Sequence, residues 1–314
     1  MDYEIINSAI SDIIKIVNNY NKEKKYDVVL CEKLVIVLLG YYLVFGPEIF
    51  QKINLILETL NIYQCDLKEE YQSVVDKINA EAGDGHKYCP ISMFDYKYQD
   101  NRFIGAVPNI IFIQKNILSD VLSIAHELSH VLEGVSAKIV IENKEFFCYE
   151  HVFEEVKVMK DNNACFRKNH GFKELVTTGV ENKIMQSFLK LDKEQIDSII
   201  IKEFLEQIKC YKGKTTLVYS YETLHLVFKD LFDNECFWNL IKKYYYENQP
   251  ELLEAEFNSY ANGLDFKILI YCAERLLLSN IDEMNYYGNI VKKQVELFSE
   301  VTNFKPDKSI LILV

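Results

Sequence analysis

The sequence predicts an α+β fold that is mostly helical and contains a small sheet. Apolar residues recur at helical spacing over the first 80 or so residues, and again from about residue 115 to Phe298. Between residues 88 and 115 the pattern changes to alternating and β-branched residues, which is typical of strands. The 314 residues include only 11 glycines and 5 prolines, too few for the many tight turns of a barrel, sandwich or propeller. These observations predict a helical protein with a few short strands.

The N-terminal part of the chain is expected to consist of helices. An apolar stretch, Leu34–Phe45, follows a polar break near residue 25. Its 12 residues would cover about 18 Å as a helix, whereas a membrane span needs roughly 20 residues. Because Glu32 and Lys33 come directly before it, we expect a buried core helix rather than a membrane element. The apolar residues that recur at helical spacing before this stretch are Ile5, Ile6, Ile10, Ile13, Ile14 and Val17.

A turn-rich segment, Ala82–His86, marks the expected boundary between a helical N-terminal region, residues 1–85, and a second region, residues 86–314. Shortly after it, aromatic residues at positions 94, 96 and 98 alternate with charged residues, which predicts a half-buried strand. The run Asn109–Ile113 is β-branched and aromatic and predicts a second strand.

Charge and cysteine content restrict the classes of partner. The net charge of −12 argues against nucleic acid or an anionic membrane as the main partner, because phosphate binding needs concentrated lysine and arginine. The chain does not start with a basic segment followed by an apolar one, so no cleaved signal peptide is expected. The eight cysteines form no CxxC pair, which argues against a zinc ribbon or a dense disulfide framework. We therefore expect a cytoplasmic protein with reduced thiols and no membrane span.

One segment combines residues that can carry chemistry, the HELSH sequence at positions 126–130. The apolar residues around it predict a largely buried helix between Asn116 and Gly134. His126 and His130 are four residues apart, which places both imidazoles on one helix face, where they can share a zinc ion. Glu127 lies beside them and can accept a proton from a water molecule that the ion activates. Since a buried helix normally rejects such groups, we favour a zinc site over a solvated polar face.

A HELSH helix preceded by a strand such as Asn109–Ile113 resembles the active-site region of the zincin metallopeptidases. The resemblance covers roughly residues 100–265, and HELSH is its specific part. It implies a zincin-like, gluzincin-like catalytic domain over residues 86–314 that holds one Zn²⁺ ion. The implied activity is hydrolysis of peptide bonds in a peptide or protein substrate, with Glu127 as the general base and His126 and His130 as metal ligands.

A catalytic zinc needs a third protein ligand and an open coordination position, and three glutamates compete for the role. Glu133 lies two turns beyond His126 on the same helix, too far along the axis, and is expected to be exposed in the last turn. Glu150 has the spacing from His130 that thermolysin-like enzymes use, but its flanking residues do not carry the rest of that pattern. Glu174 lies in a segment similar to the Asn-Glu-(Gly/Ala)-x-Thr-Glu helix that delivers the ligand in many gluzincins. We favour Glu174, and Glu150 stays open as the alternative.

The match around Glu174 is partial. Lys173, Leu175 and Thr178 stand where that helix usually has asparagine, a small residue and a final acid. These departures put in question which side chain hydrogen-bonds the metal ligands and so fixes their orientation. A second register keeps Gly179 in place of the small residue but puts Thr178 where the ligand should be.

Two other interpretations stay open. The departures near Glu174 allow a zincin-fold protein that binds a partner or regulates without turnover. Peptide deformylase also combines HExxH with an upstream cysteine, for which Cys89 is the candidate, but the chain lacks the glycine-rich neighbourhood of that enzyme. The residues that could stabilise an oxyanion are Tyr219, Tyr221, His170 and His225, and the pattern singles out none of them.

Overall fold

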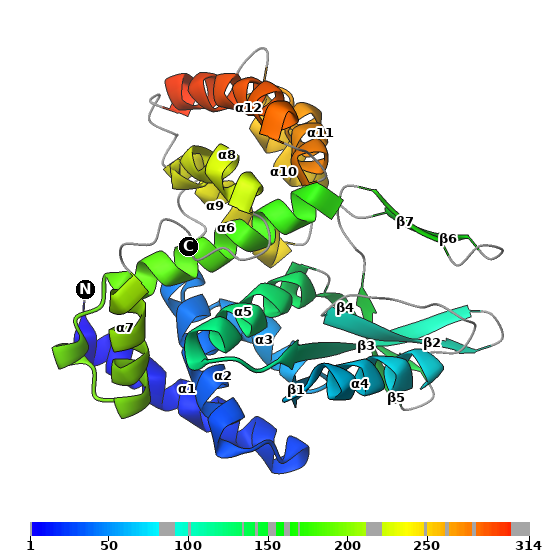
Figure 1. The fold of residues 1–314 in the computed structure, drawn as a ribbon, viewed down its shortest axis with the longest axis vertical. Helices are drawn as coiled ribbons and strands as arrows, with labels where there is room; N and C mark the ends of the chain where they lie inside the picture. The colour runs from blue at the N-terminus through cyan, green and yellow to red at the C-terminus, as the bar shows by residue number, and fades with distance from the viewer. Residues whose placement is uncertain are drawn as a thin grey trace. The chain divides into compact units, whose positions relative to one another are not determined.

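The computed structural model confirms a mostly helical α+β fold with a small sheet (Figure 1). The chain divides into two compact units, of which the first comprises Met1–Glu150, Val158–Cys165 and Val180–Leu217, and the second His151–Lys157, Phe166–Gly179 and Val218–Val314. The expected boundary near residue 85 lies outside the described residues. The structure describes residues 2–81, 92–99, 102–133, 135–141, 144–149, 155–159, 164–168, 170–211, 222–247, 250–260, 264–277 and 281–302.

The first unit begins with helix α1, Tyr3–Lys24. The Asp2 carboxylate accepts hydrogen bonds from the backbone N–H groups of the first turn, which caps the helix, and Lys25 ends it in the left-handed conformation. The buried stripe is narrower than the apolar pattern in the sequence, because Ile5 and Ile14 are exposed. The residues that α1 does bury are Ile6, Ile10, Ile13 and Val17.

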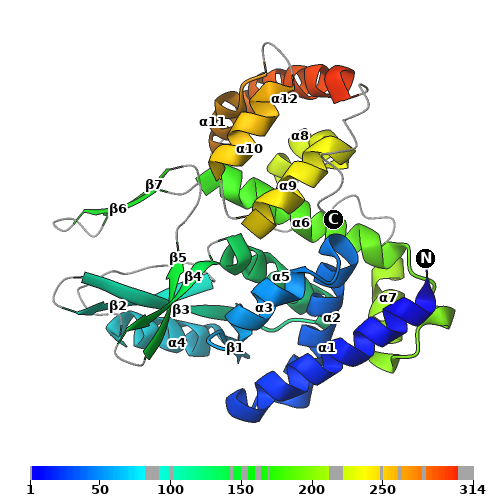
Figure 2. The same ribbon diagram turned by 180° about the vertical axis from the view of Figure 1, so that it is seen from behind.

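Helix α2, Val28–Phe45, lies beside α1 and forms the centre of the first unit (Figure 2). It is capped by Asp27 and ends at Gly46, whose positive φ of 85° favours glycine. The helix therefore starts six residues before the predicted apolar stretch and includes Glu32 and Lys33. With 18 residues α2 is long and apolar enough to cross a membrane by length and composition alone, but 67% of it is buried inside the protein. It is a core helix of this unit, as predicted.

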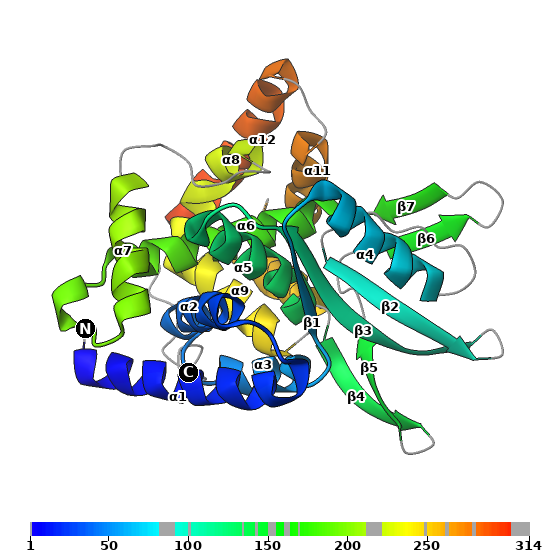
Figure 3. The same ribbon diagram turned by 60° about the horizontal axis from the view of Figure 1, so that its bottom comes forward.

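A sheet of five strands follows α2 and α3, Ile49–Leu57 (Figure 3). Strand β3 pairs in parallel with β1, placing Asn61 opposite Asn109, and antiparallel with β2 on its other side. Helix α4, Lys68–Glu81, covers β1 and β3, because its Val75 and Ile78 pack against Ile111. The predicted strands near residues 94–98 and 109–113 are thus confirmed. The five strands are β1 Asn61–Cys65, β2 Ser92–Gln99, β3 Arg102–Ile113, β4 Val135–Ile141 and β5 Lys144–Tyr149.

The prediction that the first 80 or so residues are all helical is wrong for strand β1, and the prediction that the chain after Gln114 stays helical is wrong for strands β4 to β7. Strands β4 and β5 form an antiparallel hairpin that joins the sheet through β3, where Phe147 pairs with Ala106. A further two-stranded sheet pairs β6, Glu155–Met159, with β7, Ala164–Lys168. Short runs of five to seven residues carry too little periodicity to separate a strand from a buried helix segment.

Helices complete both units. Helix α6, His170–Leu189, supplies residues to each of them, and Gly40 of α2 lets it approach closely, since a Cβ atom there would lie 2.5 Å from Ile184 Cγ2. In the second unit, aromatic rings of Phe237, Phe257 and Phe298 pack edge-on or stacked in the core. The remaining helices are α7 Ile199–Tyr211, α8 Glu222–Asp233, α9 Glu235–Glu247, α10 Pro250–Ser259, α11 Phe266–Leu277 and α12 Ile281–Thr302, with a 3₁₀ turn at Lys193–Gln195.

Candidate metal centre

The HELSH sequence lies on helix α5, Ile117–Glu133, where the sequence predicts it. Asn116 accepts a hydrogen bond from the backbone N–H of Ser119, and Asp120 accepts one from that of Lys115, so both side chains fix the start of the helix. Nearly all of α5 is buried, which is why the sequence around HELSH is so apolar. The buried apolar residues of α5 are Leu118, Val121, Leu122, Ile124, Ala125, Leu128, Val131 and Leu132.

The two histidines lie together on one face of α5. Their ring centroids are 4.9 Å apart and their planes are nearly perpendicular, at 86°. His130 is buried, and His126 is only slightly exposed. Both imidazoles are therefore shielded from water while their edges face the same space, an arrangement that suits shared coordination of one ion.

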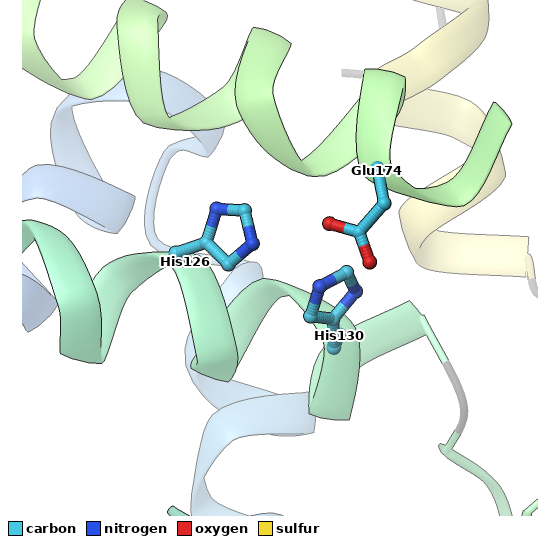
Figure 4. Close-up of side chains that lie close together, drawn as sticks. All are labelled: His126, His130 and Glu174. Atoms are coloured by element: carbon cyan, nitrogen blue, oxygen red, sulfur yellow. The ribbon is translucent and has the colours of Figure 1, made fainter. Parts of the chain in front are cut away.

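Glu174 of α6 joins the two histidines (Figure 4). One potential ligand atom from each of His126, His130 and Glu174 lies within 4.8 Å of the other two. The carboxylate reaches down from α6 toward the imidazoles of α5, and Glu174 is itself buried. The three side chains could hold a metal ion, and among the described residues they are the group with this geometry.

Glu181 lies two helical turns after Glu174 on the same face of α6 and contacts Nδ1 of His126. Its Oε2 lies 3.2 Å from Nδ1 of His126, and both side chains are largely buried. A carboxylate at Nδ1 favours the tautomer with the proton on that nitrogen, which leaves Nε2 as the electron-pair donor. In Figure 4 one ring nitrogen of His126 faces toward His130 and Glu174 while the other turns toward α6. Glu181 thus holds the imidazole in a coordinating orientation.

No pattern in the sequence assigned a role to Glu181. Where the gluzincin pattern has its final acid, this chain has Thr178, and that threonine is buried in the structure. Glu181 lies seven residues after Glu174, two helical turns along the same face, so its carboxylate can reach the neighbouring imidazole. The signal available in the sequence was this seven-residue spacing between two glutamates.

Two more glutamates of α5 are buried, and one of them contradicts its prediction. Glu127 is buried next to His126 in the chain. Glu133, expected to be exposed in the last turn, is only 5% exposed. Burial lowers the pKa of Lys52 on α3 to about 7, and the negative charge of Glu133 opposes this shift. The reason for the error is tertiary, since α3 packs against α5 and the sequence pattern of α5 alone does not show this covering helix.

Two of the residues expected to stabilise an oxyanion lie in described helices. His170 begins α6 and His225 lies in α8. Candidates outside the described residues are Cys89, Glu150, Tyr219 and Tyr221.

The donor set fits a zinc-type ion. Two imidazole nitrogens and one carboxylate oxygen are ligands that zinc prefers, and among the described residues the group has three members, the number of protein ligands typical of a catalytic zinc site. Comparisons of the chain with protein-family models, with curated proteins and with solved structures found no match. The function is therefore inferred from the residues of the cluster alone.

Proposed function

We propose that the protein is a zinc-dependent metallopeptidase that hydrolyses peptide bonds in a peptide or protein substrate. One zinc ion would be held by His126, His130 and Glu174. The observation that carries the proposal is that ligand atoms of these three side chains lie within 4.8 Å of one another, and that α5, which bears both histidines, also bears Glu127. A zincin-like catalytic core, in which strand β3 leads directly into the HExxH helix, is part of this proposal.

The burial of the cluster favours a bound cation over a purely structural role. His130 and Glu174 are each 4% exposed, and Glu127 and Glu181 are also buried nearby. Carboxylates taken out of water raise the free energy of the folded state unless a positive charge or hydrogen bonds compensate for the lost hydration. A divalent cation supplies this compensation to several carboxylates at once.

Zinc, when bound, lowers the pKa of a coordinated water molecule and polarises the scissile carbonyl group. The protein's own groups divide the remaining work. Glu127 accepts the proton of the attacking water and passes it to the departing amine nitrogen, which is general base followed by general acid catalysis. Glu181 keeps Nδ1 of His126 protonated, so that the imidazole stays neutral and turned toward the ion.

The test starts with purified full-length protein. Metal analysis is expected to find about one zinc per chain, and the protein should cleave fluorogenic peptides from a mixed-sequence library. Glu127→Gln should keep the zinc and lose cleavage, because glutamine cannot accept the proton. His126→Ala should lose both. Glu206→Gln, on the exposed face of α7, is a matched control that should change neither.

The same variants separate the proposal from its competitors. If the wild-type protein binds zinc but cleaves no peptide, and Glu127→Gln binds the same partners as wild type, the protein is a binding protein that retains the zinc site without turnover. Absence of any bound zinc, together with an unchanged stability of His126→Ala, would overturn the metal site itself.

A further inference from the structure

Helix α2 contacts the metal-binding helix through two polar side chains that its apolar sequence does not lead one to expect. The first is Lys33. Its Nζ lies 2.8 Å from Oδ2 of Asp120 near the start of α5, and these two side chains are 4% and 3% exposed. Lys33 also donates to Oε1 of Gln64 on β1 at 2.6 Å. A buried ion pair with a further hydrogen bond fixes the position of both partners, because removing either partner leaves a buried charge uncompensated.

The second side chain is Tyr41, two turns further along α2. Its hydroxyl donates to the backbone oxygen of Ala125 at 2.7 Å and lies 2.6 Å from Oγ of Ser129. Ser129 in turn donates to the same oxygen of Ala125 at 3.0 Å. Ala125 and Ser129 directly precede His126 and His130 in the chain. Tyr41 therefore contacts the one helical turn that separates the two histidines.

The two contacts have matching spacing on the two helices. Lys33 and Tyr41 are eight residues apart on α2, and Asp120 and Ser129 are nine apart on α5, about 12 and 13.5 Å of helix rise. Both sets of contacts run in the same chain direction, so α2 and α5 lie side by side in parallel at this interface. Two attachment points this far apart fix sliding along the axis and rotation about it.

Apolar packing alone does not fix these two motions. Helix α2 is apolar on nearly every face, and its buried residues extend around its circumference. Such a surface can pack against a neighbour in several registers of similar energy, whereas a single buried polar group specifies one register, as buried polar residues do in coiled coils.

We propose that Lys33 and Tyr41 of α2 fix the axial register and rotation of α5, and thereby place His126 and His130 for coordination of the same ion. Both are positioning residues, since neither is itself a ligand. The inference rests on the proposed metal site and adds to it the device that aligns two of its ligands. It also explains why so apolar a helix carries a buried lysine and a buried tyrosine hydroxyl.

The first experiment removes only the hydroxyl group. Tyr41→Phe keeps the ring that stacks on Phe45 at a centroid distance of 6.0 Å but loses the contacts to Ala125 and Ser129. We expect its affinity for Co²⁺ and Zn²⁺ to fall about tenfold, and the visible absorption bands of bound Co²⁺ to change shape and intensity. Tyr20→Phe is the matched control, because Tyr20 is a helical tyrosine whose hydroxyl donates to the backbone oxygen of Leu60 at 2.6 Å, away from α5. It should lose similar stability and keep wild-type metal affinity and Co²⁺ absorption.

The second experiment replaces the buried ion pair with a neutral pair of similar shape. Lys33→Met combined with Asp120→Asn avoids an uncompensated charge and keeps an oxygen at position 120 for the Lys115 N–H. We expect the double variant to fold and to bind metal severalfold more weakly, and addition of Tyr41→Phe should lower the affinity further. The control is Lys15→Met with Asp12→Asn, an exposed pair on α1 whose atoms also lie 2.8 Å apart.

The outcomes separate the inference from the proposed function. If wild-type protein binds no metal, the proposed function fails and this inference fails with it. If wild-type protein binds metal and both α2 variants match their controls in affinity and Co²⁺ absorption, only the inference is overturned. If Tyr41→Phe does not fold, the double variant Lys33→Met with Asp120→Asn tests the inference without it, and an affinity and Co²⁺ spectrum equal to those of its control would overturn the inference.

Discussion

Oε2 of Glu181 lies 3.2 Å from Nδ1 of His126, so a carboxylate of α6 orients an imidazole of α5 from the side opposite to Glu174. In metal sites such a partner fixes the tautomer and orientation of a coordinating histidine. The contact places this support seven residues after Glu174, whereas the gluzincin pattern would place it at Thr178, four residues after. The departure of Thr178 from that pattern therefore does not leave His126 without a supporting carboxylate.

Removal of the Glu181 carboxylate is expected to weaken metal binding. Glu181→Ala should lower zinc affinity by about 10–100-fold, because Nδ1 of His126 loses the acceptor that fixes its proton. Glu181→Gln keeps an acceptor oxygen and should recover part of the loss. Competition with a chromophoric chelator measures both. An affinity of Glu181→Ala equal to that of wild-type protein would show that His126 is oriented by other groups.

Substitution of the two candidate third ligands should give opposite results. Glu174→Gln removes the anionic oxygen that faces the histidines, and we expect zinc affinity to fall by more than the roughly 100-fold typical of losing a supporting residue. Glu150→Gln is the matched control and should retain the metal. Metal content after dialysis against a weak chelator gives the readout. The reverse pattern, with zinc lost only from Glu150→Gln, would transfer the ligand role to Glu150.

Lys52 is expected to give stability a measurable pH dependence. Burial lowers its pKa from 10.5 to about 7 in the folded protein, while the unfolded chain keeps the ordinary value. Between these pH values the unfolded state binds more protons, so the free energy of unfolding should rise with pH, by at most about 1.4 kcal/mol per pH unit. The contribution is least favourable below pH 7, where Lys52 is charged in both states.

Urea unfolding of wild-type protein and Lys52→Met at pH 7, 8 and 9 tests this expectation. The variant should lose the Lys52 component of the slope, so the difference in stability between wild type and variant should grow in favour of wild type as pH rises. Lys15→Met, at an exposed position of α1, should keep the wild-type slope. Equal slopes in wild type and Lys52→Met would refute the lowered pKa.

Gly171 at the start of α6 is expected to tolerate no larger side chain. A Cβ atom there would lie 2.5 Å from the backbone oxygen of Ala273, and the Gly171 N–H donates to Glu274 Oε2 at 2.6 Å. Since backbone cannot yield as a flexible side chain does, Gly171→Ala should lower the free energy of unfolding by about 1–3 kcal/mol. Glu174 lies one turn further along α6, so metal affinity should fall as well.

Gly288→Ala is the matched control for Gly171→Ala. Gly288 lies inside α12, and a Cβ atom there would have its nearest neighbour, Val227 Cγ2, at an ordinary contact distance of 3.7 Å. The substitution should leave stability unchanged or raise it by up to about 1 kcal/mol through helix propensity. Thermal and urea unfolding measure both variants. A Gly171→Ala protein as stable as Gly288→Ala would show that α6 and α11 can separate without cost.

Helix α5 and strand β3 were predicted because the residues that mark each of them lie within one stretch of chain. Capping residues, an apolar surround and a four-residue histidine spacing all lie within one stretch of chain, so α5 and its two histidines are placed correctly. Strand β3 was predicted from β-branched residues in the same way. Strands β1 and β4 to β7 were missed because runs of five to seven residues are too short for their periodicity to separate a strand from a buried helix segment.

The sequence by itself determined the helical character of the chain and the presence of two imidazoles and a carboxylate on one buried helix. Only the tertiary structure decided that Glu174 lies against these histidines, that Glu181 contacts His126, and that Glu133 is covered. The physical reason is that helix periodicity is set by neighbours three or four residues away, whereas these contacts join side chains more than 40 residues apart in the chain or depend on a covering helix. Such contacts depend on how α2, α3 and α6 pack on α5. The residue pattern within one helix does not show which other helices pack against it.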